Sequence, residues 1–254
     1  MNQALSPLSM DPSCPVILRL PSADNCGGVS AAAAASRESL QFSFPAVGGS
    51  DQNGAAPTCG RKAADNARQI EWPELDRPQV AGACVELAES IYWRLTPGRP
   101  SVLAITSPLD GEGKTSLVLA LAHDLAERTP GDVLAVDADP RRRELTSRLG
   151  VKEPRPDERI WPTNVPSLSV VPCFARSPAG WPDAASIAGF RKQASLAILD
   201  CPSLEHAETA SLLRACDGVY VVVRLGQTPR RAVVEAARII RACGAQLLGG
   251  IAVA

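Results

Sequence analysis

The sequence Ser107-Pro-Leu-Asp-Gly-Glu-Gly-Lys-Thr-Ser116 joins two segments with different apolar periods. Residues 102–106, before it, are mainly aliphatic and predict a strand, whereas residues 115–128, after it, carry leucine and valine at helical spacing and predict a helix. Gly111 and Gly113 can adopt backbone angles that other residues avoid, so they can turn their N–H groups toward an anion. A strand, a glycine loop and a helix in this order form an arrangement that binds phosphate groups.

The loop residues predict how a nucleotide would be held. We expect Lys114 to reach the β- and γ-phosphates and the Thr115 hydroxyl to bind Mg²⁺. Pro108 stands where the strict G-x-x-x-x-G-K-[ST] pattern has its first glycine, so the prediction depends on the loop's position as well as on the motif. Asp110 and Glu112 are interpreted as solvated carboxylates rather than catalysts. The residues predicted to bind the nucleotide are Gly111, Glu112, Gly113, Lys114, Thr115 and Ser116.

Carboxylates follow two further aliphatic segments. Asp137 and Asp139 come directly after residues 133–136, and Asp200 follows residues 196–199. Each aspartate alone would be interpreted as a turn or a helix cap. Ligands, however, collect beyond the carboxyl ends of the strands in open parallel sheets. Together with the phosphate loop, the three aspartates therefore predict a metal-nucleotide site, and their hard oxygen atoms suit Mg²⁺.

Alternation of strand and helix patterns predicts the fold class. Strands separated by helices indicate an α/β domain with a mostly parallel sheet and helices on both faces, here a P-loop nucleotide-binding domain. Near-continuous aliphatic strands agree with this, because parallel strands are buried on both sides. The clearest helices are residues 115–128 and 230–243, and a further helix leads in from Val80. The predicted strands are residues 102–106, 133–136, 168–171, 196–199, 219–223 and 247–253.

The N-terminal third has a different composition. Residues 1–78 are rich in Ala, Gly, Ser and Pro and show no sustained apolar period, so we predict a disordered low-complexity arm. The arm could be an inert linker or could dock a partner. Residues 79–254 are predicted to form the P-loop domain.

Overall composition excludes some functional classes. The formal net charge of −1 and the pI of about 6.2 give no basic field that would indicate nucleic acid as a partner. The eight cysteines lack a Cys-x-x-Cys pair and the chain has two histidines, which argues against a zinc site. No apolar run approaches the roughly 20 residues of a membrane span, so a cytoplasmic protein is expected.

Several charged side chains are assigned to structural or weak roles. His123 is interpreted as structural, because it lies in the middle of a predicted helix, and His206 is a weak candidate for a water or metal contact. Arg141, Arg142 and Arg143 could face phosphates or a polyanion, but a run of three after a turn more often forms a solvated surface.

Three motifs in order give the chain a recognisable resemblance. They are Thr106-Ser-Pro-Leu-Asp-Gly-Glu-Gly-Lys-Thr, Leu134-Ala-Val-Asp-Ala-Asp-Pro-Arg-Arg and Ala197-Ile-Leu-Asp-Cys-Pro. About residues 80–254 resemble the cytoplasmic domain of bacterial tyrosine kinases (BY-kinases) of capsule and exopolysaccharide synthesis, the CpsD/CapB type, within the MinD/ParA group of P-loop ATPases. Leu109 occupies the place of the signature MinD/ParA lysine, which favours the kinase branch.

The resemblance implies roles for individual residues. Lys114 and Asp137 would be catalytic, Thr115, Asp139 and Asp200 would surround Mg²⁺, and ATP would be the nucleotide. The chain also departs from the family pattern. It has only two tyrosines, Tyr92 and Tyr220, where these kinases usually carry a tyrosine cluster.

Two further family positions also differ. The family's Glu-x-x-Arg-x-x-Arg assembly pattern is missing from the lead helix, and Ala254 stands where the family tends to place an asparagine that contacts adenine.

Three hypotheses follow from these features. The leading one is an ATP-dependent, tyrosine-kinase-like protein that acts in polysaccharide biosynthesis or export with a membrane chain-length regulator, through which it would associate with the membrane. The second is a MinD/ParA-type ATPase switch whose nucleotide state controls dimerisation. The third is a catalytically degenerate nucleotide-sensing scaffold subunit. A homo-oligomer is compatible with each of them.

Overall fold

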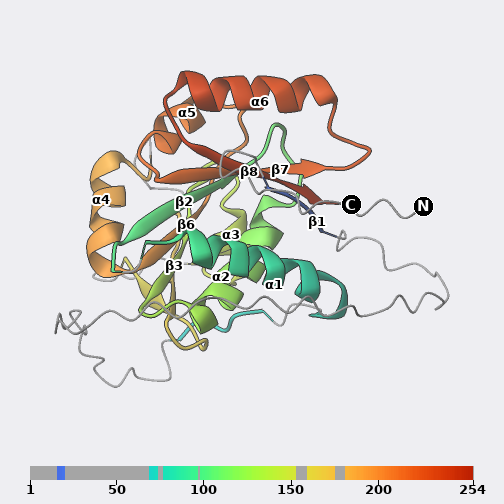
Figure 1. Ribbon diagram of the computed structural model, residues 1–254. Helices are drawn as coiled ribbons and strands as arrows, with labels where there is room; N and C mark the ends of the chain where they lie inside the picture. The colour runs from blue at the N-terminus through green and yellow to red at the C-terminus, as the bar shows by residue number, and fades with distance from the viewer. Residues whose placement is uncertain are drawn as a thin grey trace, which may run out of the picture.

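The computed structural model describes residues 16–20, 69–73, 77–96, 98–152, 159–174 and 181–253. These residues form one eight-stranded sheet with helices on both faces (Figure 1). The elements are β1 Val16–Leu20, α1 Arg77–Arg94, β2 Ser101–Thr106, α2 Lys114–Arg128, β3 Val133–Asp137, α3 Glu144–Arg148, β4 Trp161–Pro162, β5 Leu168–Val171, α4 Ala184–Gln193, β6 Leu196–Asp200, α5 Ala207–Leu213, β7 Gly218–Arg224, α6 Arg230–Ala242 and β8 Leu247–Val253.

The strand order β1-β8-β7-β2-β6-β3-β5-β4 decides where the site lies. Every neighbouring pair is parallel except β4 with β5, so the mostly parallel sheet predicted from the sequence is confirmed. The chain leaves β2 through α2 and returns as β3, and β6 later inserts between these two strands. The carboxyl ends of β2, β6 and β3 therefore meet at one edge of the sheet, where open α/β sheets bind ligands.

Alternate side chains of each buried strand enter two separate cores. In β2, Leu103 and Ile105 pack with α1, α2 and α3, whereas Val102 and Ala104 pack with α4, α5 and α6. This division follows from the period of two along a strand. It explains why the strands are aliphatic throughout, and Figure 1 shows the resulting three layers.

The six strands and two helices predicted from the sequence agree with the structure to within one residue at most ends. The predicted lead-in helix corresponds to α1, which begins at Arg77. Sequence patterns did not indicate α3, α4 or α5. These helices are short, and only two or three of their side chains are buried in each case, so the chain shows no extended helical period there.

Two segments that the sequence placed in the N-terminal arm are part of the fold. The backbone of β1 pairs in parallel with β8. Ile70 forms a bridge with Thr163, and both Ile70 and Trp72 are buried in the core that α1, α2 and α3 share. Two apolar residues such as Ile70 and Trp72 are too few to show an apolar period in the sequence. Their burial follows from the contact of this segment with β4, which only the structure shows. The other residues of the predicted arm, up to residue 76, lie outside the described residues.

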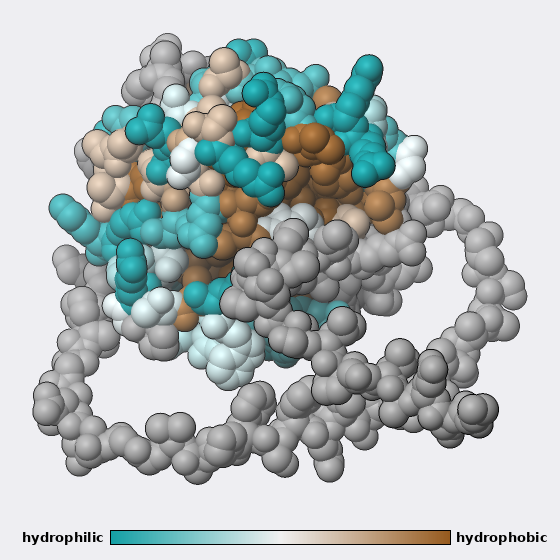
Figure 2. Space-filling model, turned by 45° about the horizontal axis from the view of Figure 1, so that its top comes forward, coloured by the Kyte–Doolittle hydropathy of each residue, from teal (hydrophilic) through white to brown (hydrophobic). Residues whose placement is uncertain are grey.

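Two of the exposed large apolar side chains of the described residues lie in or just before α6, namely Leu225 and Val234. Figure 2, which brings the α6 side forward, shows a hydrophobic area bordered by hydrophilic side chains. The described helices also include none with the length and apolarity needed to cross a membrane.

The turn between α2 and β3 gives a test of the fold. Gly131 has a φ of 112°, and a Cβ placed there would lie 2.3 Å from Ser195 Oγ. We expect Gly131→Ala to lower the free energy of unfolding by about 1–3 kcal/mol, because the alanine backbone would be strained at this φ and its Cβ would collide with Ser195. Gly189→Ala is the control, since Gly189 lies in α4 with open space around it and alanine favours helix. Chemical denaturation measures both, and equal stability of the two variants would contradict the turn geometry.

Candidate functional site

The loop between β2 and α2 has the conformation that the sequence predicted. Gly111 and Gly113 have φ values of 81° and 87°, in the left-handed region that favours glycine. A Cβ at either position would meet no heavy atom within 4 Å, so the space beside the loop is open. Gly113 caps the N-terminus of α2, which begins at Lys114. The first turn of this 15-residue helix therefore presents its N–H groups and its positive dipole end at the loop.

Lys114 is buried at the start of α2, with only 7% of the residue exposed. Its Nζ donates to Ser107 Oγ at 3.0 Å, so the side chain folds back over the loop. An ammonium group has three donors, and a buried one is stabilised by an anion. The Lys114 ammonium group is therefore held against the first residue of the loop.

The loop is fixed to the segment that follows β6. Leu204 N donates to Ser107 O at 2.8 Å, and Asp110 N donates to Glu205 Oε2 at 3.0 Å. Thr106 Oγ1 also donates to the Pro202 carbonyl at 2.7 Å. These bonds hold the phosphate loop against residues 202–205, so the two segments act as one surface.

Asp110 is partly exposed and forms long ion pairs with two side chains. His206 Nε2 lies 3.6 Å and Arg142 Nη1 3.5 Å from Asp110 Oδ2. The weakly predicted His206 thus contacts a loop carboxylate. Burial favours a higher pKa for Asp110, but the nearby Ser203 hydroxyl and the charges of Lys114, Arg142 and His206 outweigh it, so the pKa is lowered.

Glu112 is not the solvated carboxylate that we expected. It is 4% exposed, and Thr228 Oγ1 donates to its Oε1 at 2.5 Å. Its Oε2 is buried without a hydrogen-bond partner among the described residues, and burial raises the pKa of the carboxyl. Thr228 Oγ1 accepts from Arg224 N at 2.9 Å, and Arg224 Nη1 donates to Gly111 O at 3.4 Å. The loop after β7 therefore holds the phosphate loop from its second side.

Thr115 and Asp200 meet directly, although 85 residues separate them. Thr115 Oγ1 donates to Asp200 Oδ2 at 2.7 Å, and Asp200 is 2% exposed. The other oxygen, Asp200 Oδ1, is buried and lacks a hydrogen-bond partner within the described part of the chain. Burial and the neighbouring Asp137 charge raise the pKa of Asp200 to about 8. An orphaned carboxylate oxygen beside a hydroxyl is a hard donor set that suits Mg²⁺.

Asp137 lies in the site, but its carboxylate is directed at α3. It stands opposite Asp200 in the register of β3 with β6. Its Oδ2 accepts from Thr146 N at 2.8 Å and from Thr146 Oγ1 at 2.5 Å, and its Oδ1 accepts from Asp139 N at 3.2 Å. Burial raises the pKa of Asp137 to about 6 despite these bonds. Sequence reasoning missed Thr146, for which no motif gave a signal.

Asp139 is buried and shapes the loop that leads to α3. Its Oδ1 accepts from Arg141 N at 3.0 Å and from Arg142 N at 3.2 Å. Arg141 pairs with Glu208, and both Arg141 and Arg142 are about half exposed, as expected for a solvated surface. The three aspartates do not form a group whose oxygens all converge on one point, according to the described side chains. Of the three, Asp200 has a buried oxygen with no hydrogen-bond partner among the described residues, whereas Asp137 and Asp139 accept from backbone N–H groups.

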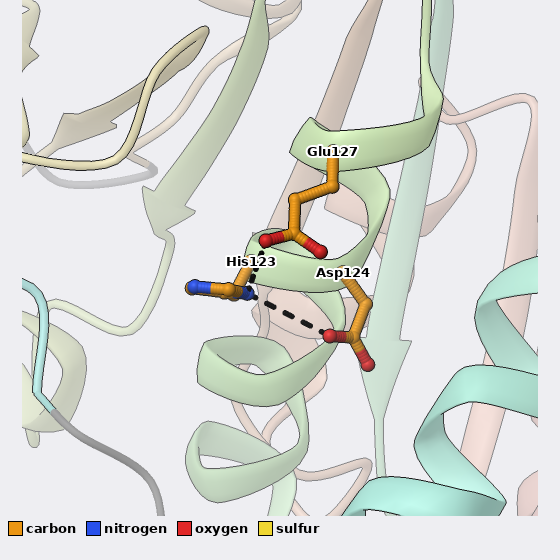
Figure 3. Close-up of side chains that lie close together, drawn as sticks. All are labelled: His123, Asp124 and Glu127. Carbon is orange, nitrogen blue, oxygen red and sulfur yellow. Dashed lines mark ion pairs between the residues drawn. The ribbon is translucent and has the colours of Figure 1, made fainter.

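His123, Asp124 and Glu127 form a separate group on α2 (Figure 3). His123 Nδ1 lies 3.6 Å from Asp124 Oδ1 and 4.0 Å from Glu127 Oε1. These are neighbours on one helix, and Glu127 is well exposed. The contacts agree with the structural role predicted for His123.

Comparison with protein-family models gives no match, and neither does comparison with curated proteins. Solved structures do match. The BceF tyrosine kinase domain has a TM-score of 0.58 at 23% identity, over 67% of this chain and 76% of that one. The kinase domain of Escherichia coli tyrosine kinase ETK has a TM-score of 0.60 at 19% identity, over 76% and 84%.

MinD of Pyrococcus horikoshii, complexed with Mg-ADP, has a TM-score of 0.53 at 19% identity, over 60% of this chain and 70% of that one. The chain therefore has the P-loop fold that these kinase domains and MinD ATPases share.

The raised pKa of Asp200 predicts how stability depends on pH. A carboxyl whose pKa is higher in the folded state binds more protons there, so stability falls as pH rises toward the folded pKa. Between pH 6 and 8 we expect the ligand-free protein to lose stability with a slope of up to about 1.4 kcal/mol per pH unit from this group. Asp200→Asn should remove most of that slope in urea denaturation at several pH values. A slope unchanged by the substitution would contradict a buried, protonated Asp200.

The contact between Glu112 and Thr228 can be tested by removing a hydroxyl. Thr228→Val would leave both oxygens of Glu112 without a donor, so we expect the free energy of unfolding to fall by about 1–3 kcal/mol. Thr228→Ser keeps the hydroxyl and is the matched control. Thermal unfolding measures both. If the Thr228→Val and Thr228→Ser variants were equally stable, the hydrogen bond from Thr228 to Glu112 would contribute nothing to the free energy of unfolding.

Proposed function

We propose that the chain binds ATP with Mg²⁺ and transfers the γ-phosphoryl group to a hydroxyl, as a tyrosine-kinase-like protein of polysaccharide biosynthesis or export. The observation that carries this is the junction of Lys114, Thr115 and the unpartnered oxygen of Asp200 at one helix N-terminus. The fold shared with two tyrosine kinase domains supports the kinase assignment. A membrane chain-length regulator would be its partner, and the cytoplasm its location.

The residues would act mainly by positioning and by neutralising charge. N–H groups from Gly111 to Ser116 would surround the phosphates, and Lys114 would move from Ser107 to the β- and γ-phosphates. Thr115, Asp139 and Asp200 would surround Mg²⁺, and Thr115 and Asp200 would hold it directly. The metal would neutralise charge that develops on the phosphate oxygens.

Asp137 would orient or deprotonate the incoming hydroxyl. Its pKa of about 6 leaves it ionised at neutral pH, as a base requires. Thr146 donates two hydrogen bonds to the Asp137 carboxylate. To act as a base, Asp137 would have to be released from them, so the segment that leads to α3 would have to move when substrates bind.

A second candidate is an ATPase switch, in which water is the acceptor. The fold similarity to MinD with Mg-ADP favours it, and so does the position of the tyrosines. Tyr220 is 2% exposed within β7, and burial raises its pKa. Tyr92 is half-buried near the end of α1. This helix leads into the N-terminal end of β2, whereas the phosphate loop follows the C-terminal end of β2. Neither tyrosine of the chain is placed to receive phosphate from its own site.

Labelled ATP separates these candidates. The protein is incubated with Mg²⁺, γ-labelled ATP and a random Glu-Tyr copolymer as acceptor, and phosphotyrosine is separated from free phosphate. We expect phosphotyrosine on the copolymer. Lys114→Ala should reduce it by about 100-fold or more, because a major electrostatic contact with the transferred group is lost. Asp137→Asn should lower it by about 100-fold while ATP binding is retained.

Three other outcomes would overturn the kinase proposal. Free phosphate without phosphotyrosine would select the ATPase switch. ATP binding without turnover would select a nucleotide-sensing scaffold. Product formation that is equal in the Lys114→Ala variant would show that the phosphate loop is not the site.

A further inference from the structure

Arg148, at the end of α3, contacts the phosphate-binding helix from outside the three motifs. Its Nη1 donates to Ser116 Oγ at 2.8 Å, and its Nη2 donates to Glu144 Oε1 at 2.5 Å. Ser116 lies in the first turn of α2, two residues after Lys114. The Arg148 side chain is about half exposed, so it lies at the surface beside the first turn of α2 and not in the core.

The position of Ser116 shows which side of the loop Arg148 borders. Thr115 is bonded to Asp200, and Lys114 would reach the β- and γ-phosphates. Ser116 is the next residue in the first turn of α2, whose N–H groups would face the α- and β-phosphates. Since Ser116 Oγ accepts from Arg148, its own O–H can donate to a phosphate oxygen, and the guanidinium lies beside it.

We propose that Arg148 binds the α-phosphate side of the nucleotide directly, as a second cation beside Lys114. This inference rests on the proposed nucleotide site. A guanidinium fork suits phosphate oxygens, because it can donate two parallel hydrogen bonds to them. Glu144 accepts from the same guanidinium, so a bound phosphate group would compete with Glu144 for these donors. The ligand recognised is thus any adenine nucleotide with an α-phosphate, irrespective of the reaction that follows.

Equilibrium titrations with ATP, ADP, AMP and adenosine test this assignment. We expect Arg148→Ala to weaken the binding of all three phosphorylated ligands by about tenfold or more, through the loss of a charge-assisted bond. Adenosine binding should not change. Arg148→Lys keeps the charge but loses the fork, and it should give an intermediate loss. Arg241→Ala, on the last turn of α6, is the control for removal of an exposed arginine.

The Ser116→Ala protein shows whether Arg148 contacts the phosphate itself or only orients the Ser116 hydroxyl. In a Ser116→Ala protein, Arg148→Ala should still weaken ADP binding severalfold, because the guanidinium itself contacts phosphate. No further loss in that background would overturn the proposal, and so would an equal loss for adenosine. Thermal unfolding without ligand checks that each variant is folded.

The wild-type and Lys114→Ala proteins complete the comparison. If the folded wild type binds no nucleotide, the proposed function fails, whatever Arg148 does. If the wild type binds and Lys114→Ala does not, while Arg148→Ala binds as the wild type does, only the assignment of Arg148 fails.

Discussion

The parallel pairing of β6 between β2 and β3 is the constraint on which the site depends. It places Asp200 beside the end of β2, where Thr115 can donate to it, and opposite Asp137 on β3. Neither contact is available from any local stretch of chain, since Thr115 and Asp200 are 85 residues apart. Burial raises the pKa of both aspartates, because water cannot solvate their charged forms. The charge of Asp137 raises the pKa of Asp200 further, so Asp200 is ionised readily only when a cation is bound beside it.

Three segments hold the phosphate loop and the first turn of α2. The segment after β6 bonds to Ser107 and Asp110, the end of β7 and the loop after it bond to Gly111 and Glu112, and α3 contacts Ser116 through Arg148. Preorganised N–H donors are effective at binding anions because little reorganisation is needed when the charge arrives. The contact of α3 could also respond to a nucleotide, since a phosphate group would compete for the donors of Arg148.

Much of the fold could be predicted from the sequence because its signal is local. A strand buried on both faces needs aliphatic residues throughout, and the strands from β2 to β8, apart from the two-residue β4, show this plainly. The phosphate loop was visible for the same reason, since Gly111, Gly113 and Lys114 are consecutive or nearly so. The helix α3 gave no such signal, because five residues are too few to show a helical period.

The partners of the site residues could not be predicted, because strand order decides them. Thr228 reaches Glu112 across 116 residues of sequence, and only the position of β7 beside β2 explains why a loop carboxylate is buried. Thr146 likewise bonds to Asp137 because α3 folds back over the end of β3. Spacing showed that Asp137 and Asp139 are neighbours, but it could not show that Asp137 faces Thr146 while Asp139 caps the next turn.

The proposed metal-nucleotide site requires both Asp200 and the phosphate loop. Calorimetric titration of ADP, with and without Mg²⁺, in the wild type and in Asp200→Asn tests this requirement. We expect Mg²⁺ to strengthen binding to the wild type by about tenfold or more and to have little effect on the variant. A Mg²⁺ effect of equal size in both proteins would show that Asp200 does not hold the metal.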